Sequence, residues 1–413
     1  MRKYPVYNQL STSDISKEVL KRWQEEGTFG KSISSRRGKP AYNFYEGPPS
    51  ANGLPGIHHV MGRAIKDIFC RFKTLEGYQV ERKAGWDTHG LPVELGVEKE
   101  LGITKEDIGK KISVEDYNEA CKKAVMRYTN IWNDLTEKMG YWVDMEDPYI
   151  TYKTKYMESV WWLLKQLWDK QLIYKGYTIQ PYSPKAGTGL SSHELNMPGS
   201  YRDVKDTSAI AQFPAIKNNQ LKAVFGDAIS DEDRLYFLAW TTTPWTLPSN
   251  TALTVGKKID YVLIDSFNPY THLRQKVVLA KNLVGKYFKE ENKSLAFDDY
   301  PKNGKNIPWT QVWEGKGLDL LDLKYEQLLD YVLPYENADQ AFRIIPGDFV
   351  TTEDGTGIVH TAPTFGADDA KVAKDAGVPP MLVLDDNENP VPLVDLQGRF
   401  TKHMGDLAGK YVK

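Results

Sequence analysis

Residues 42–59, which read YNFYEGPPSANGLPGIHH, decide the fold of the first half of the chain. The aromatic run at residues 42–46 predicts a short strand, and the prolines, glycines and small residues after it predict a loop through Pro55. Beyond the loop, apolar side chains recur at spacings of three and four and predict a helix that stops near Gly77. The stripe consists of Ala64, Ile65, Ile68, Phe69, Phe72 and Leu75. A strand, a loop and a helix in this order begin a βαβ unit, which predicts a doubly wound, Rossmann-like parallel sheet.

Two further helices and a change of pattern follow along the chain. The apolar periodicity predicts one helix over residues 117–135 and another over residues 157–168. From about residue 200, short β-rich runs alternate with turn signals and predict a separate, barrel-like domain. The runs cover residues 236–240, 251–255, 261–264, 277–279, 349–352 and 357–360, with an exposed loop at residues 298–308. We therefore predict an α/β domain over residues 1–198 that is interrupted by a β-rich domain over residues 199–413.

The composition restricts the classes of function. With 413 residues, the chain has room for two or three domains of roughly 150 residues each. Lys and Arg number 53 against 55 for Asp and Glu, and the formal net charge of -2 is not that of a polyanion-binding chain. Any nucleic-acid contact therefore needs a local patch. Cys70 and Cys121 are too few for a disulfide framework, which favours a reducing compartment and two buried small side chains.

Nothing in the sequence predicts a membrane segment. Residues 1–10 lack the apolar run of a secretory signal, and no apolar run elsewhere approaches the roughly 18 residues that span a bilayer. We therefore expect a cytoplasmic protein with no membrane partner.

The first candidate site is the loop at residues 47–56 with the two histidines that follow it. A helix N-terminus carries unpaired N–H groups and the positive end of the helix dipole, so it attracts phosphate. Small residues let a ligand approach the backbone. His58 and His59 can donate hydrogen bonds to charge that develops on a phosphoryl group. The alternative is a plain glycine-rich loop with surface histidines.

A second loop, residues 85–94 (GWDTHGLPVE), follows a strand candidate at residues 79–83. Ligands of a doubly wound sheet bind at the carboxyl ends of its strands, so we expect both loops to open onto one crevice. The carboxylate of Asp87 can hold an ammonium group there. The alternative is that Asp87 caps the following helix.

Residues 45–55, His59 and residues 84–94 together resemble the catalytic domain of class I aminoacyl-tRNA synthetases, in the group specific for isoleucine, valine and leucine. In this family the helix begins with His-Ile-Gly-His, whereas residues 56–59 here read GIHH. The last histidine matches, the first is replaced by glycine, and the usual glycine is replaced by histidine. The resemblance implies that ATP binds at this helix.

The same resemblance assigns roles to single residues. It implies that His59, beside Gly56, binds the phosphates of ATP and that His58 stands in for the missing first histidine. The residues that it places in the amino-acid site are Gly47, Pro48, Asp87 and His89. Within that site, Asp87 is expected to hold the substrate's ammonium group.

Two motifs in the β-rich half are similar to the editing domains of the isoleucine-specific members. Residues 239–250 read AWTTTPWTLPSN, whereas valine and leucine enzymes usually carry Arg-Pro-Glu or Arg-Pro-Asp after the threonines. Residues 355–363 read GTGIVHTAP and are followed by Asp368 and Asp369, which matches the second editing motif. The two motifs imply a site that hydrolyses mischarged tRNA.

Such hydrolysis makes modest demands, because the mischarged end of a tRNA is already an activated ester. It requires a held ammonium group, an oriented ribose and a positioned water. Asp369 can hold the ammonium group. Hydroxyl, amide and imidazole contacts can come from Thr241, Thr242, Thr243, Asn250 and His360. Alone, the threonine run also fits an ordinary strand, and the pair of His360 and Asp369 fits a metal site with too few ligands.

Taken as a whole, the resemblance implies a monomeric ligase that activates isoleucine with ATP and Mg²⁺, transfers it to tRNA(Ile) and removes valine by hydrolysis. Many relatives carry a Cys-x-x-Cys pair after Pro-Tyr, but residues 183–186 here read SPKA, so zinc is not expected in this region. No Lys-Met-Ser-Lys-Ser pentapeptide occurs. We therefore expect the N-terminal part of a longer enzyme, not competent alone for full aminoacylation.

Two alternatives remain open at this point. The nearest is a valine- or leucine-specific synthetase, against which residues 243–245 (TPW) argue. The other is a freestanding RNA-binding or proofreading module with a vestigial nucleotide fold.

Overall fold

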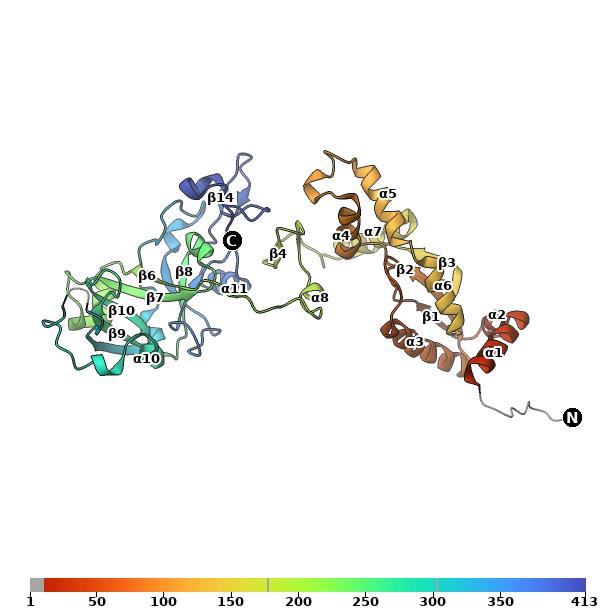
Figure 1. The fold of residues 1–413 in the computed structure, drawn as a ribbon, viewed down its shortest axis with the longest axis horizontal. Coiled ribbons are helices and arrows are strands. Elements are labelled where there is room, and N and C mark those ends of the chain that lie inside the picture. The colour runs from red at the N-terminus through yellow and green to blue at the C-terminus, as the bar shows by residue number, and fades with distance from the viewer. Residues whose placement is uncertain (1–10, 177, 302–303) are drawn as a thin grey trace. The chain divides into compact units, whose positions relative to one another are not determined.

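The computed structural model describes residues 11–176, 178–301 and 304–413, and the chain divides into two compact units, Met1–Lys175 and Gly176–Lys413 (Figure 1). The stretch at residues 1–10, for which the sequence excludes a secretory signal, lies outside the described residues. The predicted domain boundary between residues 198 and 199 stays a prediction.

The first unit contains a three-stranded parallel sheet in the order β1-β2-β3. Its strands are β1 (Ala41–Tyr45), β2 (Gln79–Trp86) and β3 (Asp144–Ile150). The helices are α1 (Thr12–Glu26), α2 (Thr28–Ser34), α3 (Ile57–Leu75), α4 (Leu91–Leu101), α5 (Val114–Val125), α6 (Thr129–Lys138) and α7 (Thr154–Asp169). Helix α3 connects β1 to β2, as a parallel pair requires. The predicted α/β organisation with a parallel sheet is confirmed.

A buried arginine ties α3 to the central strand of this sheet. The guanidinium of Arg82 on β2 donates to the carbonyl oxygen of Cys70 at 3.0 Å and to Oγ1 of Thr74 at 2.6 Å. Both acceptors lie in the last turns of α3. The contacts hold the helix along the strand, so its first turn stays at the end of β1.

The single helix predicted over residues 117–135 is wrong, because the structure has two helices, α5 and α6, with a break at residues 126–128. The break frees the N–H of Tyr128 to donate to the carbonyl oxygen of Ala51 at 3.0 Å. One turn later, the indole of Trp132 donates to the carbonyl oxygen of Gly53 at 2.9 Å. The periodicity continues across the break, but the two bonds to the loop after β1 outweigh helix continuity.

The predicted helices α3 and α7 are present, but their apolar stripes face outward. On α3, Ile68 is 65% exposed and Leu75 is 82% exposed. On α7, Trp161 and Trp168 are also exposed. The residues of this unit that the structure describes leave these side chains exposed, so the periodicity predicted the helices correctly without locating a core.

The second unit is built on an eight-stranded sheet. Its strands are β6 (Ala209–Pro214), β7 (Leu235–Thr241), β8 (Ala252–Val255), β9 (Asp260–Phe267), β10 (Arg274–Ala280), β11 (Trp309–Lys316), β12 (Arg343–Pro346) and β13 (Ile358–Thr361). The path is β11-β9-β10-β7-β13-β8-β12, and β6 pairs with β7. The smaller elements are β4 (Tyr182–Ser183), β5 (Thr188–Gly189), α8 (Ser192–Leu195), α9 (Asn219–Phe225), α10 (Val284–Tyr287), α11 (Ala367–Ala376), β14 (Val383–Leu384) and β15 (Pro390–Val391).

A short segment between β11 and β12 closes part of this sheet into a ring. Lys324 forms a bridge with Arg343 on β12, and the next residue, Tyr325, forms a bridge with Ala215 beside β6. The ring therefore runs through β7, β13, β8, β12, this segment and β6, and the side chain of Tyr325 is fully buried. The predicted β-rich, barrel-like unit is confirmed.

One predicted strand, at residues 349–352, is wrong, and the strand in this region is β12. Strand β12 pairs in parallel with β8 over its whole length, from Arg343 to Pro346. The N–H of Gly347 then donates to the carbonyl oxygen of Val255 and ends the pairing. Residues 349–352 instead lead into the turn at Gly355 and Gly357, whose positive φ values of 72° and 77° suit glycine.

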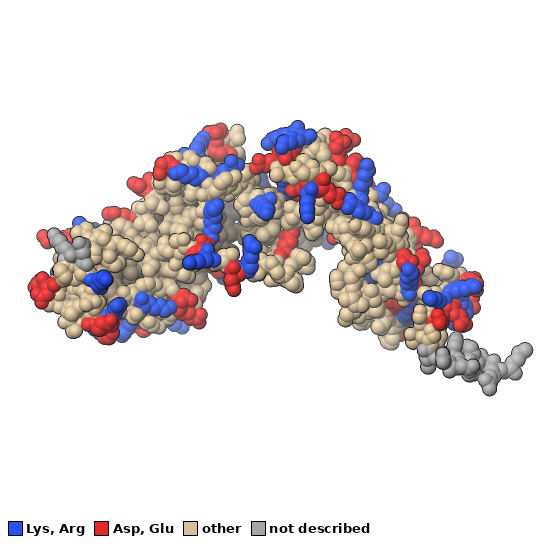
Figure 2. All heavy atoms as spheres, in the orientation of Figure 1, with Lys and Arg blue, Asp and Glu red and all other residues tan. Residues whose placement is uncertain are grey.

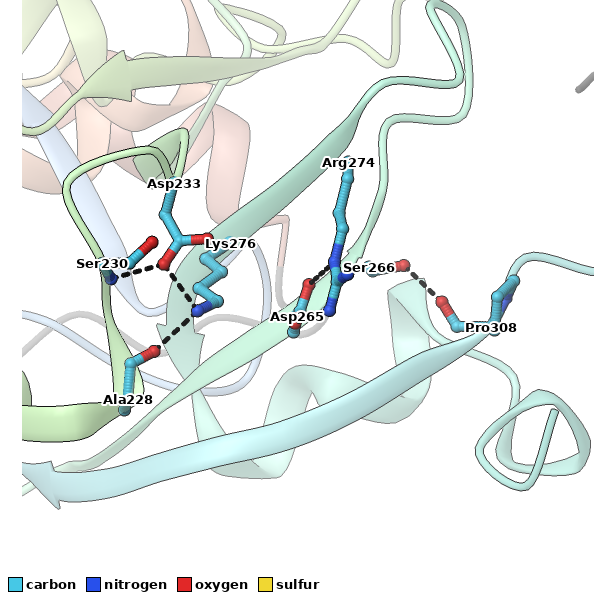
Figure 3. Close-up of polar contacts among 8 residues, drawn as sticks. All are labelled: Ala228, Ser230, Asp233, Asp265, Ser266, Arg274, Lys276 and Pro308. Carbon is cyan, nitrogen blue, oxygen red and sulfur yellow. Dashed lines mark hydrogen bonds and ion pairs between the residues drawn. The ribbon is translucent and has the colours of Figure 1, made fainter. Parts of the chain in front are cut away.

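Ion pairs fix strands β9 and β10 of the second unit (Figure 3). The partly buried Lys276 on β10 lies 2.8 Å from the carboxylate of Asp233 and donates to the carbonyl oxygen of Ala228 at 2.7 Å. Arg274 donates twice to Asp265 on β9, at 3.1 and 2.8 Å. These contacts stabilise the part of the sheet that contains β9 and β10. The site described below lies at the ends of β7 and β13.

The surface carries both signs of charge. On the face shown in Figure 2, Lys and Arg are interspersed with Asp and Glu, in keeping with the formal net charge of -2. Within the part of the chain that the structure describes, no helix has both the length and the apolar composition of a membrane-spanning segment.

Candidate functional site

The first candidate site lies where β1 and β2 end. The two strands run parallel, so the loops that follow them leave the same edge of the sheet. The N–H of Asp87 donates to the carbonyl oxygen of Pro49 at 3.0 Å, which joins the two loops directly. The two loops therefore lie at one edge of the sheet, whereas the expectation that they open onto one crevice stays a prediction.

A cleft of about 330 Å³ opens beside the first loop. Among the residues that line it are Gly47, Pro48, His58, His59, Lys66 and Trp132. The structure therefore brings together Gly47 and Pro48 of the loop with the two histidines of the first helical turn. Gly56 is the N-cap residue of α3. Asp87 and His89 are exposed on the neighbouring loop and do not line this cleft.

Asp87 does not cap the helix that follows it. The N-cap residue of α4 is Gly90, and the carboxylate of Asp87 accepts from the N–H of His89 at 3.3 Å. The loop is held by Thr88, whose N–H donates to Oγ1 of Thr151, the residue directly after β3, at 2.9 Å. Asp87 thus stands on a loop fixed at both sides, with its carboxylate open to solvent.

The hydrogen bonds of His59 define which of its nitrogens can meet a ligand. Its Nδ1 accepts from the N–H of Gly56 at 2.9 Å. Burial, with the nearby charges of His58, Arg63 and Lys66 as further causes, lowers the pKa of His59 below its usual value. A neutral ring whose Nδ1 is an acceptor carries its proton on Nε2. His59 therefore offers a neutral N–H donor to the cleft.

A side chain at position 56 would have to displace the His58 ring, which occupies the space above the glycine. A Cβ atom at this position would lie 2.8 Å from Cε1 of His58. The rings of His58 and His59 are 3.8 Å apart between centroids, and His59 packs edge-on against Trp132 at 4.7 Å. The glycine at position 56 therefore leaves room for the ring of His58.

Two cations continue the basic face of α3 behind His59. Arg63 is buried, donates to Oγ1 of Thr136 at 2.7 Å and lies 4.9 Å over the ring of Trp132. Lys66 lies 2.5 Å from the carboxylate of Glu46. Neither residue was predicted from the sequence, although spacings of four and three place His59, Arg63 and Lys66 on one helix face.

Glu46, which was not predicted as a site residue either, holds the end of β1. Its side chain is 3% exposed and accepts from Lys66 and from the hydroxyl of Tyr141. The hydroxyl of Tyr149 donates to the carbonyl oxygen of Glu46. Burial, and then the bond to Glu46, raise the pKa of Tyr141. The sequence signal that could have identified Glu46 is a carboxylate directly before a Gly-Pro-Pro turn.

The second candidate site lies where β7 and β13 end. These strands pair in parallel through Trp240 and Val359, so the threonine segment after β7 starts beside His360. The short helix η3 (Pro244–Ser249) follows the threonines. Its Trp245 packs edge-on against Phe365 at 4.9 Å between ring centroids. The two motifs of the β-rich half therefore lie side by side.

The three predicted threonines have different surroundings. The N–H of Thr243 donates to Oγ1 of Thr241 at 3.0 Å, and the carbonyl oxygen of Thr243 accepts from the hydroxyl of Thr246 at 2.8 Å. Thr242 is exposed, and its hydroxyl makes no hydrogen bond to any residue that the structure describes. Thr241 and Thr243 thus shape the turn, and Thr242 presents a free hydroxyl.

His360 and Asn250 are buried and bonded to each other. Nδ1 of His360 lies 2.9 Å from Nδ2 of Asn250, and its Nε2 lies 2.9 Å from Oγ1 of Thr246. The carboxamide oxygen of Asn250 accepts from the hydroxyl of Tyr325 at 2.6 Å. Burial lowers the pKa of His360 to about 4. Neither Thr246 nor Tyr325 was predicted: Thr246 lies within the motif at residues 239–250 but received no role, and no motif marks Tyr325.

Asp369 lies on the first turn of α11, close to the same strand end. Its Oδ2 accepts from the N–H of Ala362 at 2.9 Å. Burial raises its pKa above the usual value, and the bond to Ala362 opposes this shift. Its neighbour Asp368 is exposed. Asp369 can therefore offer its second oxygen to a cation.

A metal centre has no support in residues 11–176, 178–301 and 304–413. Within those ranges, no three His, Cys, Asp or Glu side chains are placed to hold one ion.

Comparisons with known proteins give one family. Residues 18–353 match the family model described as tRNA synthetases class I (I, L, M and V). The chain is 61% identical over 409 residues to the isoleucine–tRNA ligase of Cytophaga hutchinsonii, which covers 98% of this chain and 36% of that protein. It is 59% identical over 420 residues to the isoleucine–tRNA ligase of Bacteroides thetaiotaomicron, over 100% of this chain and 36% of that protein. The chain thus spans about a third of the length of these relatives.

Among solved structures, the chain is similar to the editing domain of the P. knowlesi cytosolic leucyl-tRNA synthetase. The match has 14% identity and a TM-score of 0.30, and it covers 41% of this chain and 62% of that chain.

Proposed function

Since the chain belongs to the class I tRNA synthetases, we propose that it functions as an isoleucine–tRNA ligase that activates isoleucine with ATP, transfers it to tRNA(Ile) and hydrolyses valine products. The observation that carries the proposal is the identity of 61% and 59% to two isoleucine–tRNA ligases over nearly the whole chain. The geometry of the two sites supports a division of labour between activation and hydrolysis.

The first site fits the phosphates of ATP. When the isoleucine carboxylate attacks the α-phosphate, negative charge grows on the phosphoryl oxygens. The neutral Nε2–H of His59 and the N-terminus of α3 stabilise that charge, and Arg63 and Lys66 add positive potential behind them. When bound, Mg²⁺ supplies further charge neutralisation. We assign it no protein ligand, because Glu46 in this cleft already accepts from Lys66 and Tyr141.

The amino-acid side of this site uses the loops at the end of β1 and β2. We assign the wall of the isoleucine pocket to Gly47 and Pro48, and the contact to the substrate ammonium group to Asp87. The solvent-open carboxylate of Asp87 supports that role, and His89 is tied to it through its N–H. His58 is assigned to the phosphates beside His59 because its ring fills the space that Gly56 leaves.

The second site is proposed to hydrolyse valine esters and adenylates. A hydrophobic pocket discriminates poorly against a substrate smaller by one methylene, so a second pocket is needed to remove valine. Asp369 holds the substrate ammonium group with the oxygen that Ala362 leaves free. The exposed hydroxyl of Thr242 lies on the turn next to this strand end and is the available contact for the ribose or the attacking water.

Two activity assays on the full protein test the proposal. We expect isoleucine-dependent exchange of pyrophosphate into ATP and hydrolysis of Val-tRNA(Ile). Exchange that is faster with valine or leucine, together with hydrolysis of Thr-tRNA(Val), would establish the valine- or leucine-specific alternative. RNA binding without either reaction would establish the freestanding module.

Further assignments follow from the same proposal. Residues 199–413 form the editing domain, and residues 1–198 belong to the nucleotide-binding domain. The protein acts as a monomer in the cytoplasm, and residues 183–186 bind no zinc.

A further inference from the structure

The hydrogen-bond partners of Asn250 determine the orientation of its carboxamide. Nδ2 lies 2.8 Å from the carbonyl oxygen of Ala252, which can only accept. The opposite atom, Oδ1, lies 2.6 Å from the hydroxyl of Tyr325, which donates to it. Both ends of the carboxamide therefore agree on one orientation, and Nδ2 is the atom that faces His360.

This orientation determines the tautomer of His360. Nδ2 of Asn250 donates to Nδ1 of His360 at 2.9 Å, so Nδ1 carries no proton. The ring is 7% exposed and neutral, so the proton is on Nε2 and is donated to Oγ1 of Thr246 at 2.9 Å. The hydroxyl of Thr246 then donates to the carbonyl oxygen of Thr243 at 2.8 Å. Every donor in the chain from Tyr325 to Thr243 is thus assigned.

The same chain leaves Asn250 and His360 with no free polar atom for a substrate. Oδ1 of Asn250 accepts from the hydroxyl of Tyr325, and its Nδ2 donates to the carbonyl oxygen of Ala252 and to Nδ1 of His360. Both nitrogens of His360 are bonded within the protein. The free hydroxyl at this place belongs to Thr242, in the turn that Thr241 and Thr246 hold on both sides of Thr243.

We propose that Tyr325 and Thr246 are positioning residues of the hydrolytic site: the buried chain Tyr325–Asn250–His360–Thr246 sets the turn at residues 241–243 and so directs the Thr242 hydroxyl to the substrate. The inference rests on the proposed editing function. Tyr325 can serve in this way because its segment closes the ring between β12 and β6, which places its hydroxyl inside the barrel.

The first experiment measures hydrolysis of Val-tRNA(Ile) by single-site variants. Tyr325→Phe removes only the hydroxyl at the start of the hydrogen-bond chain. We expect kcat to fall about tenfold with KM near the wild-type value, because Tyr325 does not touch the substrate. The matched control is Tyr261→Phe. Tyr261 is equally buried in the same unit, and its hydroxyl donates to the carbonyl oxygen of Gly357 and not to Asn250.

A second pair of variants tests the other end of the chain. Thr246→Val removes the hydroxyl that links His360 to the turn, and we expect a loss of kcat at least as large as in Tyr325→Phe. Thr246→Ser keeps the hydroxyl and restores activity to near the wild-type value. A loss that is the same in the valine and serine variants, or in Tyr325→Phe and Tyr261→Phe, overturns the positioning role.

The tautomer is measured independently of activity. The chain has seven histidines, so a ¹H–¹⁵N spectrum of the ¹⁵N-histidine-labelled protein can resolve His360, assigned by its loss in His360→Gln. We expect a proton on Nε2 at pH 7, and mixed tautomers in Asn250→Leu. A proton on Nδ1 in the wild type overturns the inference. Wild-type protein with the expected tautomer but no hydrolysis overturns the editing function, and with it the role in hydrolysis, while the hydrogen-bond chain stands.

Discussion

The two candidate sites each contain a histidine near the carboxyl end of a parallel strand, yet they use it in opposite ways. Nδ1 of His59 accepts a hydrogen bond from the N–H of Gly56, and its Nε2 remains available to a ligand in the cleft. Both ring nitrogens of His360 form hydrogen bonds inside the barrel, to Asn250 and Thr246. Burial lowers the pKa of both rings, so both are neutral donors at pH 7. The difference lies in where the Nε2 proton points, outward to a ligand or inward to the protein.

This comparison separates residues that touch a substrate from residues that hold others in place. In the first site the polar atoms that remain free belong to the motif itself, at the start of α3. In the second site the motif histidine is fully engaged, and the free groups are the Thr242 hydroxyl and one oxygen of Asp369. A shared residue type therefore does not imply a shared role, and each role can be tested separately.

The largest effect is expected at the free carboxylate of the second site. Asp369→Ala removes the group assigned to the substrate ammonium, and we expect hydrolysis of Val-tRNA(Ile) to fall about 1,000-fold, because a lost partner of a charged pair costs several kcal/mol. Aminoacylation with isoleucine is expected to stay near the wild-type rate. The matched control is Asp368→Ala, whose side chain is exposed on the same turn. Equal losses in the two variants would contradict the role of Asp369.

The next largest effect is expected at the free nitrogen of the first site. His59→Ala removes a hydrogen bond to the phosphate, and we expect isoleucine-dependent pyrophosphate exchange to fall about 100-fold, as for other preorganised donors. Hydrolysis of Val-tRNA(Ile) is expected to stay unchanged. The control His193→Ala changes an exposed histidine outside both sites. If exchange is unaffected by His59→Ala, the outward donor has no role in activation.

A smaller effect is expected in stability, and it tests the inward histidine. The pKa of His360 is about 4 in the folded protein, below its usual value of about 6.5. A lowered pKa stabilises the fold above pH 6.5, and this stabilisation is lost as the pH falls toward 4. Between pH 7.5 and 5 we expect wild-type protein to lose about 2 kcal/mol more unfolding free energy than His360→Asn. Denaturant titrations at both pH values, followed on the amides of β8 and β13, measure this difference.

The contrast between the sites also explains what the sequence could predict. The parallel sheet and the meeting of the two loops follow from local patterns, and the structure has both. The two motifs of the β-rich half were linked by the family resemblance, and the structure places them side by side. The buried chain at His360 does not follow from them, because Tyr325 is 75 residues from Asn250 and His360 is 110 residues from it. Such bonds depend on how the barrel closes, and no short motif encodes that closure.

The errors in secondary structure have the same origin. The helix predicted over residues 117–135 breaks because Tyr128 donates to Ala51, a residue of the loop after β1. The strand predicted at residues 349–352 is displaced because β8 already pairs with β12. In both cases a contact from a distant part of the chain outweighed the local preference.

The smallest effect is expected where the first motif departs from its family. A Cβ at position 56 would lie 2.8 Å from Cε1 of His58, so Gly56→Ala must displace that ring, although the backbone there has an ordinary φ of −109°. If His58 contributes one weak contact to the phosphate, displacement is expected to raise the KM for ATP about tenfold, which is the effect of losing one ordinary hydrogen bond. His58→Ala is expected to give a similar loss, and the double variant Gly56→Ala/His58→Ala no further loss, because one ring accounts for both effects. Losses that add in the double variant would show that Gly56 acts through the backbone at the helix start and not through His58.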